Sequence, residues 1–270
     1  MARAGGQDDV FATLSSARRV WAIAAIHGEA DKLKRVSREL ERRFQPGDRL
    51  VFLGNVVGLG SGVIETVDEI LRLRRVLLAR PGMEPWDFAF LRGAQEEMWH
   101  KLLQLQYAVG PSDVFDWMLR QGIEPTLRAY GGHPDQARAT LRQGALAIAR
   151  WTAGLRQAIR AYPGHEDYYA AVRRAAITAD RSLLFVNTGL DPTRPIDSQG
   201  DAFWWGGAGF GELSGAFEGF RLVVRGFDRA MGGVAVGAHK ASIDGGAGRG
   251  GPVIAGCFGS EGRALDWIEG

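Results

Sequence analysis

The sequence predicts one layered α/β domain, and three observations support this prediction. Short apolar runs over residues 20–26 and 50–53 each lead into a glycine-containing turn and then into an amphipathic helical pattern. The 270 residues are 46% hydrophobic and 24% charged, which is an ordinary globular composition. Strand-like runs also return after a long helical stretch. We therefore expect residues 1–270 to form one domain in which helices pack on sheets.

The first part of the chain alternates strands and helices. A polar stretch at residues 1–18 predicts a flexible N-terminal tail, and the first strand follows it. Apolar residues then recur at helical spacing over residues 31–44, with charged residues on the opposite face. The strand over residues 50–53 leads into a second amphipathic helix, and the apolar residues 76–79 predict a third strand.

The pattern between residues 85 and 180 is helical and predicts a helical insertion, or cap, on the α/β domain. Its arginines recur near helical spacing, which raises the alternative of a basic binding face. We favour a solvated helix face, because the charge of the whole chain is balanced. The arginines in question are Arg138, Arg142, Arg150, Arg156 and Arg160.

Four apolar runs predict strands in the last third of the chain, at residues 183–186, 222–225, 233–236 and 253–255. Glycine-rich turns join the last three, which predicts a second, partly antiparallel sheet. The glycines at 245–251 also suggest a phosphate loop. We favour a turn, because no Gly-Lys-Ser/Thr sequence follows them.

Charge and composition exclude several classes of partner. The formal net charge is +2, so no strong field attracts nucleic acid or an anionic membrane. The single cysteine, Cys257, cannot form an internal disulfide, and the first residues lack the apolar core of a signal peptide. No uncharged apolar run approaches the roughly 18 residues that span a bilayer. We expect a cytoplasmic protein that binds neither nucleic acid nor membrane.

Three loops follow the predicted strands in a fixed order. They read Ala-Ile-His-Gly at 25–28, Gly-Asn-Val-Val-Gly-Leu-Gly at 54–60 and Arg-Pro-Gly-Met-Glu at 80–84. This order resembles the calcineurin-like metallophosphoesterases, whose signatures are Asp-x-His-Gly, Gly-Asp-x-x-Asp-Arg-Gly and Gly-Asn-His-Glu. The resemblance is to the branch of bacterial serine/threonine protein phosphatases and diadenosine tetraphosphatases. Similar segments recur at residues 125–131, 184–192, 198–204, 224–228 and 242–247.

The resemblance implies a four-layer sandwich of two mixed sheets flanked by helices, with residues 85–180 as the cap. In the family, two divalent metals (Mn, Fe or Zn) are held by ligands from these loops and from two later ones. Only His27 matches the expected ligand. Two such ions bring four positive charges and need anionic ligands, yet no carboxylate remains at these positions, so we expect no metal or other cofactor. The other five positions hold Ala25, Asn55, Gly82, Asn187 and Phe227.

The catalytic groups that the resemblance implies are also replaced. The family histidine that protonates the leaving oxygen falls at Met83, and the arginine that clamps the phosphate falls at Leu59. Neither side chain donates a proton or a bidentate hydrogen bond. We therefore expect no intact catalytic residue and a pseudophosphatase that acts by binding a protein partner or a small ligand.

Two alternatives stay open. One is an active phosphoesterase whose rebuilt site uses His27, Glu84 and two divalent metals. The other is a metal-free cleft for an apolar ligand, lined by Ala25, Leu59, Met83 and Phe227. The plainer interpretation makes His27 a turn or core histidine, the two asparagines turn residues, and Glu84 a capping residue. A replacement metal site built from His133, His165 and His239 is disfavoured.

Overall fold

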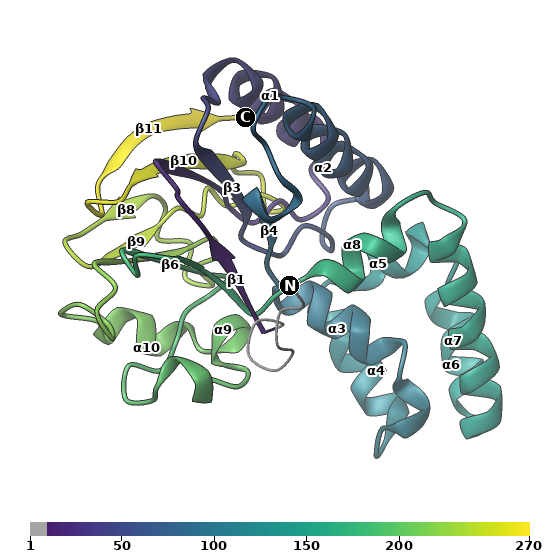
Figure 1. Cartoon of the computed structure of the whole chain (residues 1–270). Helices are drawn as coiled ribbons and strands as arrows, with labels where there is room; N and C mark the ends of the chain where they lie inside the picture. Colours follow the sequence, from purple (N-terminus) through teal and green to yellow (C-terminus); the bar gives the residue numbers. More distant parts are fainter. Residues whose placement is uncertain (1–9) are drawn as a thin grey trace, which may run out of the picture.

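The computed structural model describes residues 10–270, and within them the strands form two mixed sheets (Figure 1). One sheet has the order β11-β10-β2-β3-β4, in which β2, β3 and β4 are parallel. Its strands are β2 (Arg19–Ile23), β3 (Asp48–Phe52), β4 (Phe88–Phe90), β10 (Ile254–Gly259) and β11 (Ala264–Glu269).

The other sheet has the order β1-β5-β6-β7-β9-β8, with β6, β7 and β9 parallel. Its strands are β1 (Phe11–Leu14), β5 (Ala175–Thr178), β6 (Leu183–Val186), β7 (Leu222–Arg225), β8 (Ala235–Val236) and β9 (Lys240–Ser242).

Three apolar layers hold the sandwich together, and the alternation of side chains along the strands builds them. In β2, Val20 and Ala22 point between the two sheets, whereas Trp21 and Ile23 point toward the helices α1 (Ala30–Arg43) and α2 (Val63–Leu78). The outer face of the other sheet is covered by α9 (Ala202–Trp205) and α10 (Gly207–Glu212), joined to it by the 3₁₀ turn Ile196–Ser198. The predicted order of helices, sheet, sheet and helices is confirmed.

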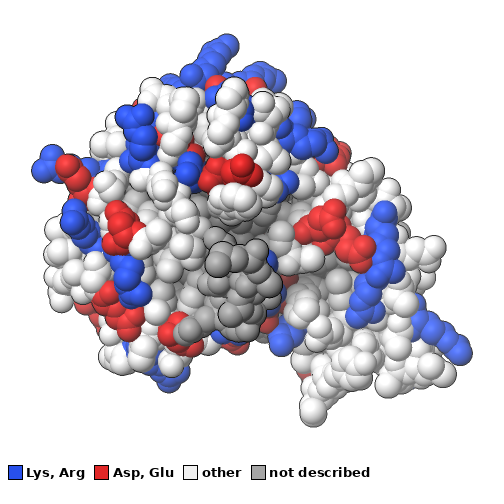
Figure 2. Space-filling model, viewed as in Figure 1, with Lys and Arg blue, Asp and Glu red and all other residues white. Residues whose placement is uncertain are grey.

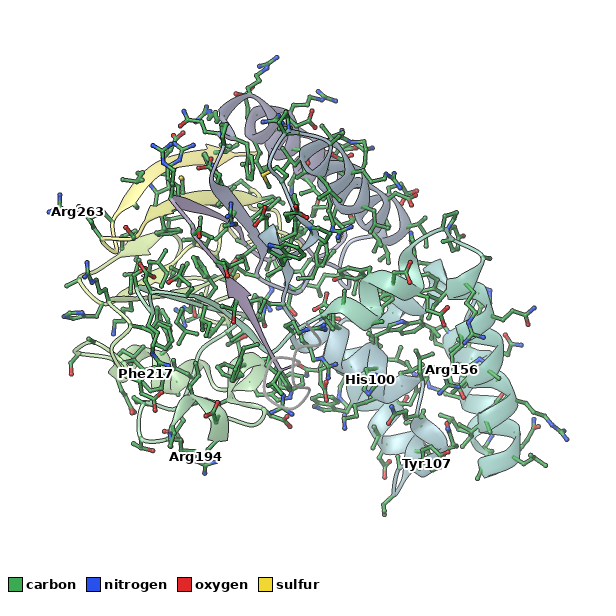
Figure 3. All side chains as sticks on the ribbon, in the orientation of Figure 1. His100, Tyr107, Arg156, Arg194, Phe217 and Arg263 are labelled. Carbon is green, nitrogen blue, oxygen red and sulfur yellow. The ribbon has the colours of Figure 1, made fainter. Side chains whose placement is uncertain are left out.

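Helices α3 to α8 form an insertion that projects from one side of the sandwich (Figure 1). Figure 3 places Tyr107, which is 82% exposed, at its far end. Three of its arginines, Arg128, Arg138 and Arg160, pair with carboxylates, and the face in Figure 2 mixes both signs of charge. The elements are α3 (Ala94–Leu102), a 3₁₀ turn (Leu105–Tyr107), α4 (Pro111–Arg120), α5 (Glu124–Ala129), α6 (Pro134–Leu141), α7 (Ala145–Arg160) and α8 (His165–Ala171). No helix within residues 10–270 has both the length and the apolar composition needed to cross a membrane.

The predicted third strand at residues 76–79 is wrong. Those residues lie at the end of α2, whose apolar spacing from Val67 through Ile70 and Leu73 continues to Leu77. No helix breaker precedes residue 80, so the apolar run prolongs the helix. The third strand is β4, which follows the 3₁₀ turn Pro85–Asp87.

Three predicted boundaries also differ from the structure: those of the N-terminal tail, the helical insertion and the strand at residues 253–255. The tail prediction for residues 1–18 is wrong for residues 11–14, which form β1 beside β5, with Leu14 buried in the core; residues 1–9 lie outside the described part. The insertion spans residues 94–171 rather than 85–180, because β4 and β5 belong to the sheets. The predicted strand at 253–255 falls largely in β10, which pairs with β2 and so lies in the first sheet.

Candidate functional site

The loops that follow β2 and β3 lie side by side at the carboxyl edge of their sheet. The backbone N–H of His27 donates to the carbonyl of Asn55 at 2.8 Å, and Gly28 N–H donates to Val56 at 2.9 Å. Gly28 has φ of +74°, and a Cβ there would lie 2.6 Å from the carbonyl oxygen of Gly60. Glycine is therefore required for the close approach of the two loops.

The loops after β6 and β7 reach the same place from the other sheet. Asn187 donates its Nδ2 to the carbonyl of Leu53 at 2.7 Å, and Ala25 N–H donates to the carbonyl of Gly226 at 2.9 Å. The ring of Phe227 meets the imidazole of His27 edge to face, with centroids 5.4 Å apart. The structure thus brings together the predicted positions in four of the five loops.

The prediction that Gly82, Met83 and Glu84 form the third loop of the site is wrong. These residues connect α2 to the start of β4, and because β3 and β4 run parallel they lie at the opposite edge of the sheet. Glu84 caps the 3₁₀ turn before β4, which agrees with its predicted structural role. Neither the apolar cleft that included Met83 nor the rebuilt site that included Glu84 is formed.

The loop that follows β4 instead reads Gly93-Ala94-Gln95-Glu96. Against the signature Gly-Asn-His-Glu, it keeps the glycine and the glutamate and replaces the metal-binding asparagine and the acidic histidine. The sequence carried a signal for this loop, because an apolar run at residues 88–91 is followed by a glycine and then, three residues later, by a glutamate. The mistaken strand at residues 76–79 hid it.

Glu96 is the only carboxylate in the four residues of this loop, and it is fully engaged. Its oxygens accept backbone N–H groups from Asn55, Val56 and Gly93, each at 2.8 Å, and the hydroxyl of Tyr168 at 3.3 Å. The side chain is 2% exposed. Glu96 therefore holds the loop at residues 54–60 in place through backbone hydrogen bonds. Its oxygens have no free lone pair with which to bind a metal.

The two asparagines that replace family ligands are also engaged by the protein. The Oδ1 of Asn55 accepts the backbone N–H of Gln95 at 3.0 Å, and the Oδ1 of Asn187 accepts the hydroxyl of Thr188 at 2.9 Å. Asn55 has φ of +53°, a conformation that asparagine tolerates better than most residues. Both side chains hold turns together, as the plainer interpretation predicts.

His27 is enclosed by apolar groups at the centre of the site. The side chain is buried, and within residues 10–270 neither ring nitrogen has a hydrogen-bond partner. Burial, aided by the nearby charge of Arg249, lowers the pKa of His27 to about 4. The imidazole is therefore neutral near pH 7 and is a poor general acid there.

Leu59, at the position of the phosphate-clamping arginine, packs against the helical insertion. Its backbone N–H donates to the carbonyl of Gly122 at 3.1 Å, and a Cβ on Gly122 would lie 2.3 Å from Leu59 Cδ2. On the other side, a Cβ on Gly248 would lie 2.6 Å from the Cβ of His27 and 3.2 Å from that of Leu59. Apolar packing thus fills the space between these loops.

The remaining carboxylates near these loops serve internal bonds. Asp244 accepts the backbone N–H of Asp228 at 2.8 Å and that of Gly246 at 2.9 Å, and burial raises its pKa. Asp228 pairs with Arg225 at 2.7 Å. Across the described residues, no three His, Cys, Asp or Glu side chains gather closely enough to hold an ion, and His133, His165 and His239 are not brought together. The donor set of the described residues therefore does not fit a two-metal centre.

Comparisons with known proteins agree on the fold. No family model matches the chain, and no curated protein matches its sequence. Among solved structures, a candidate diadenosine tetraphosphatase is similar with a TM-score of 0.57 and 17% identity, covering 97% of this chain and 98% of that one. A cold-active protein tyrosine phosphatase is similar with a TM-score of 0.53 and 12% identity, covering 94% and 80% of the two chains. The chain has the fold of the calcineurin-like metallophosphoesterases.

Proposed function

We propose that this chain is a pseudophosphatase: a metallophosphoesterase-fold protein without two-metal hydrolysis, which acts by binding a partner. The observation that carries the proposal is the chemistry at the convergent loops. The family ligand positions hold Ala25, His27, Asn55, Ala94, Asn187 and Phe227. One neutral imidazole and two amides already bonded within the protein offer no charge to offset two divalent ions.

The catalytic groups support the same proposal independently of metal. Gln95 stands where the family has its acidic histidine, and its Nε2 donates to the carbonyl of Gln121 at 2.9 Å. A side-chain amide donates hydrogen bonds but is not acidic, so it cannot protonate a leaving group at neutral pH. Leu59 stands where the arginine would bind phosphate, so a phosphoryl group would meet an apolar surface.

The competing candidate is an active phosphoesterase with a rebuilt site. The observation in its favour is that neither ring nitrogen of His27 has a hydrogen-bond partner of good geometry within residues 10–270, and an unsatisfied buried polar group calls for an explanation such as a bound ion or a catalytic role. The test is turnover of an aryl phosphate, a phosphopeptide and diadenosine tetraphosphate with Mn²⁺ present. We expect the native chain and the His27→Ala variant to give the same background rate. Robust turnover by the native chain that is lost in the His27→Ala variant would establish the competing candidate.

A further inference from the structure

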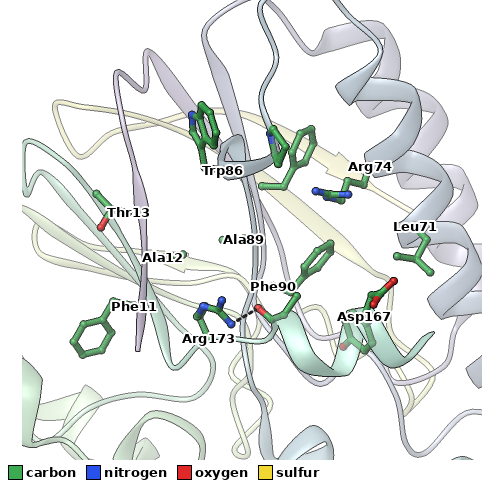
Figure 4. A pocket seen from close by; sticks show the side chains of 14 residues that line it. Phe11, Ala12, Thr13, Leu71, Arg74, Trp86, Ala89, Phe90, Asp167 and Arg173 are labelled. Carbon is green, nitrogen blue, oxygen red and sulfur yellow. Dashed lines mark hydrogen bonds between the residues drawn. The ribbon is translucent and has the colours of Figure 1, made fainter. Parts of the chain in front are cut away.

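A second region of the molecule lies between the two sheets, away from the convergent loops. β4 is the last strand of one sheet and β1 is the last strand of the other. Within residues 10–270 neither has a neighbouring strand on its outer side, although Arg173 forms an isolated bridge with Leu91 at the end of β4. A cavity of about 460 Å³ opens between them (Figure 4). In Figure 4, Phe11 and Thr13 of β1 lie on one side of it, and Leu71, Arg74 and Asp167 from helices lie on the other.

The backbone of β4 directs hydrogen-bonding groups at this cavity. Leu91 N–H donates to Phe52 of β3, so alternate residues, Leu91 and Ala89, face β3. Phe88 and Phe90 therefore face outward, and the carbonyl of Phe90 indeed accepts the backbone N–H of Arg173 at 2.8 Å. The N–H and carbonyl of Phe88 lie further along the same edge, where the cavity opens.

The backbone of β1 faces the cavity in the same way. Arg174 N–H donates to the carbonyl of Val10, and Ala179 N–H donates to that of Leu14. The even-numbered residues of β1 therefore face β5, and Phe11 and Thr13 face outward. Residues 173 and 174 thus bridge the two edges at one end, and beyond them the edges are separated by the cavity.

The side chains around the cavity are mostly apolar, with Asp167 as the one carboxylate among the described residues of the lining and Arg74 as a cation at the aromatic wall. Phe88 and Phe90 supply aromatic walls, and the guanidinium of Arg74 lies 5.7 Å from the Phe88 ring centroid. Within residues 10–270 no carboxylate forms an ion pair with Arg74, and a cation next to an aromatic wall is a ready partner for an anionic side chain.

The rim of the cavity is held rigidly. Trp86 is 58% exposed, yet the turn that carries it is anchored by Asp87, which is 2% exposed and pairs with Arg49 at 2.8 Å. Arg49 in turn donates to the carbonyl of Ser15, next to β1. An exposed indole on such a turn loses little conformational entropy when it binds, which favours recognition.

We propose that this cavity binds an extended peptide segment that adds a strand to the edge of β4. Its apolar side chains, at alternate positions, pack on the aromatic walls, and a carboxylate side chain pairs with Arg74. Strand addition accounts for the meeting, within residues 10–270, of the free part of the β4 edge, the outer edge of β1 and a cation that has no carboxylate partner. The inference builds on the proposed binding function by naming a class of partner.

The experiment starts with libraries of ten-residue peptides that carry a fixed central Glu, or a fixed central Lys, and random flanking residues. We expect the native full-length chain to enrich the Glu library, with β-branched or aromatic residues at alternate positions. The most enriched peptide is then labelled and titrated by fluorescence anisotropy. Failure to enrich the Glu library over the Lys library would overturn the proposal.

Variants and modified peptides then test the geometry. Arg74→Gln should weaken binding about tenfold or more, because a charge-assisted bond is lost. The matched control is Arg75→Gln, the next residue on the same helix, which is exposed and does not line the cavity. It should bind like the native chain, and thermal melts should show both variants folded. Equal affinity in the native chain and the Arg74→Gln variant would contradict the proposal.

Methylation of single peptide nitrogens distinguishes strand addition from binding by side chains alone. We expect N-methylation at alternate positions to abolish binding and at the intervening positions to leave it nearly unchanged, because only every second N–H faces the edge strand. Binding that is insensitive to methylation at every position would indicate that the peptide binds through its side chains alone and would refute strand addition. These outcomes are independent of metal binding and turnover, so either proposal can fail alone.

Discussion

The imidazole of His27 lies in surroundings that differ from those of a working metal ligand. It is buried against Phe227 and Gly248, and no carboxylate of the described residues bonds its nitrogens to fix a tautomer. Metal-binding histidines normally have such a partner on the second nitrogen. The position matches the histidine of the Asp-x-His-Gly signature but lacks the surroundings that would make it a ligand.

This environment predicts a pH-dependent loss of stability. The pKa of His27 falls from 6.5 to about 4 on folding, so the unfolded chain takes up the proton first. Stability is therefore at its full value above about pH 6.5 and declines as the pH falls toward 4. His27→Gln, which cannot be protonated, should lose about 2–3 kcal/mol less than the native chain between pH 7 and pH 4.5.

Urea unfolding at the two pH values measures this difference. His133→Gln is the matched control, because His133 is exposed, and its pH dependence should follow that of the native chain. An identical pH dependence in the native chain and the His27→Gln variant would show that His27 is solvated or paired in the folded protein.

Glu96 is the second residue on which the site depends. Replacing it by glutamine turns one acceptor oxygen into an NH₂ group, which then faces a backbone N–H. We expect Glu96→Gln to lower the free energy of unfolding by about 1–3 kcal/mol. Denaturant unfolding measures the loss, with the exposed Glu261→Gln as the control. A Glu96→Gln variant as stable as the control would contradict the bonds assigned to this carboxylate.

At the scale of elements, the helical insertion is fastened to the second loop where Leu59 meets Gly122. Gly122 has φ of +92°, and an added Cβ would overlap Leu59. Gly122→Ala should therefore destabilise the protein by about 1–2 kcal/mol or more. Gly154, in the middle of α7, has nothing within 4 Å of an added Cβ.

Gly154→Ala is therefore the control. It should raise the free energy of unfolding by about 0.5–1 kcal/mol, because alanine has the higher helix propensity. Thermal melts of the two variants suffice for the comparison. If Gly122→Ala were neutral, the insertion would not be packed on the loop as described.

Helices and strands were predicted well where the apolar residues followed a single spacing, either helical or alternating. The strands β6 and β7 and the helix α1 agree with prediction to within a residue at each end, because apolar spacing and breakers coincide there. The run at residues 76–79 failed, because a short apolar stretch that ends an amphipathic helix looks like a strand. That single error moved the third loop from residues 93–96 to residues 81–84, so Gly82 and Met83 were assigned in place of Ala94 and Gln95.

At the scale of the whole molecule, the two-sheet sandwich brings distant loops to one place regardless of what they contain. The positions of Ala25, Asn55, Asn187 and Phe227 followed from the order of motifs, because each loop directly follows a predicted strand. The pairing of β10 with β2 and the position of β1 at a sheet edge were not predictable, since pairing between strands far apart in the sequence has no local signal.

The most direct test of the central claim is a count of bound metal. The native chain and the His27→Ala variant are equilibrated with Mn²⁺, gel-filtered and measured by elemental mass spectrometry. We predict no manganese retained in stoichiometric amount by either protein. Two ions per native chain, lost in the His27→Ala variant, would contradict the claim that these loops do not form a metal centre.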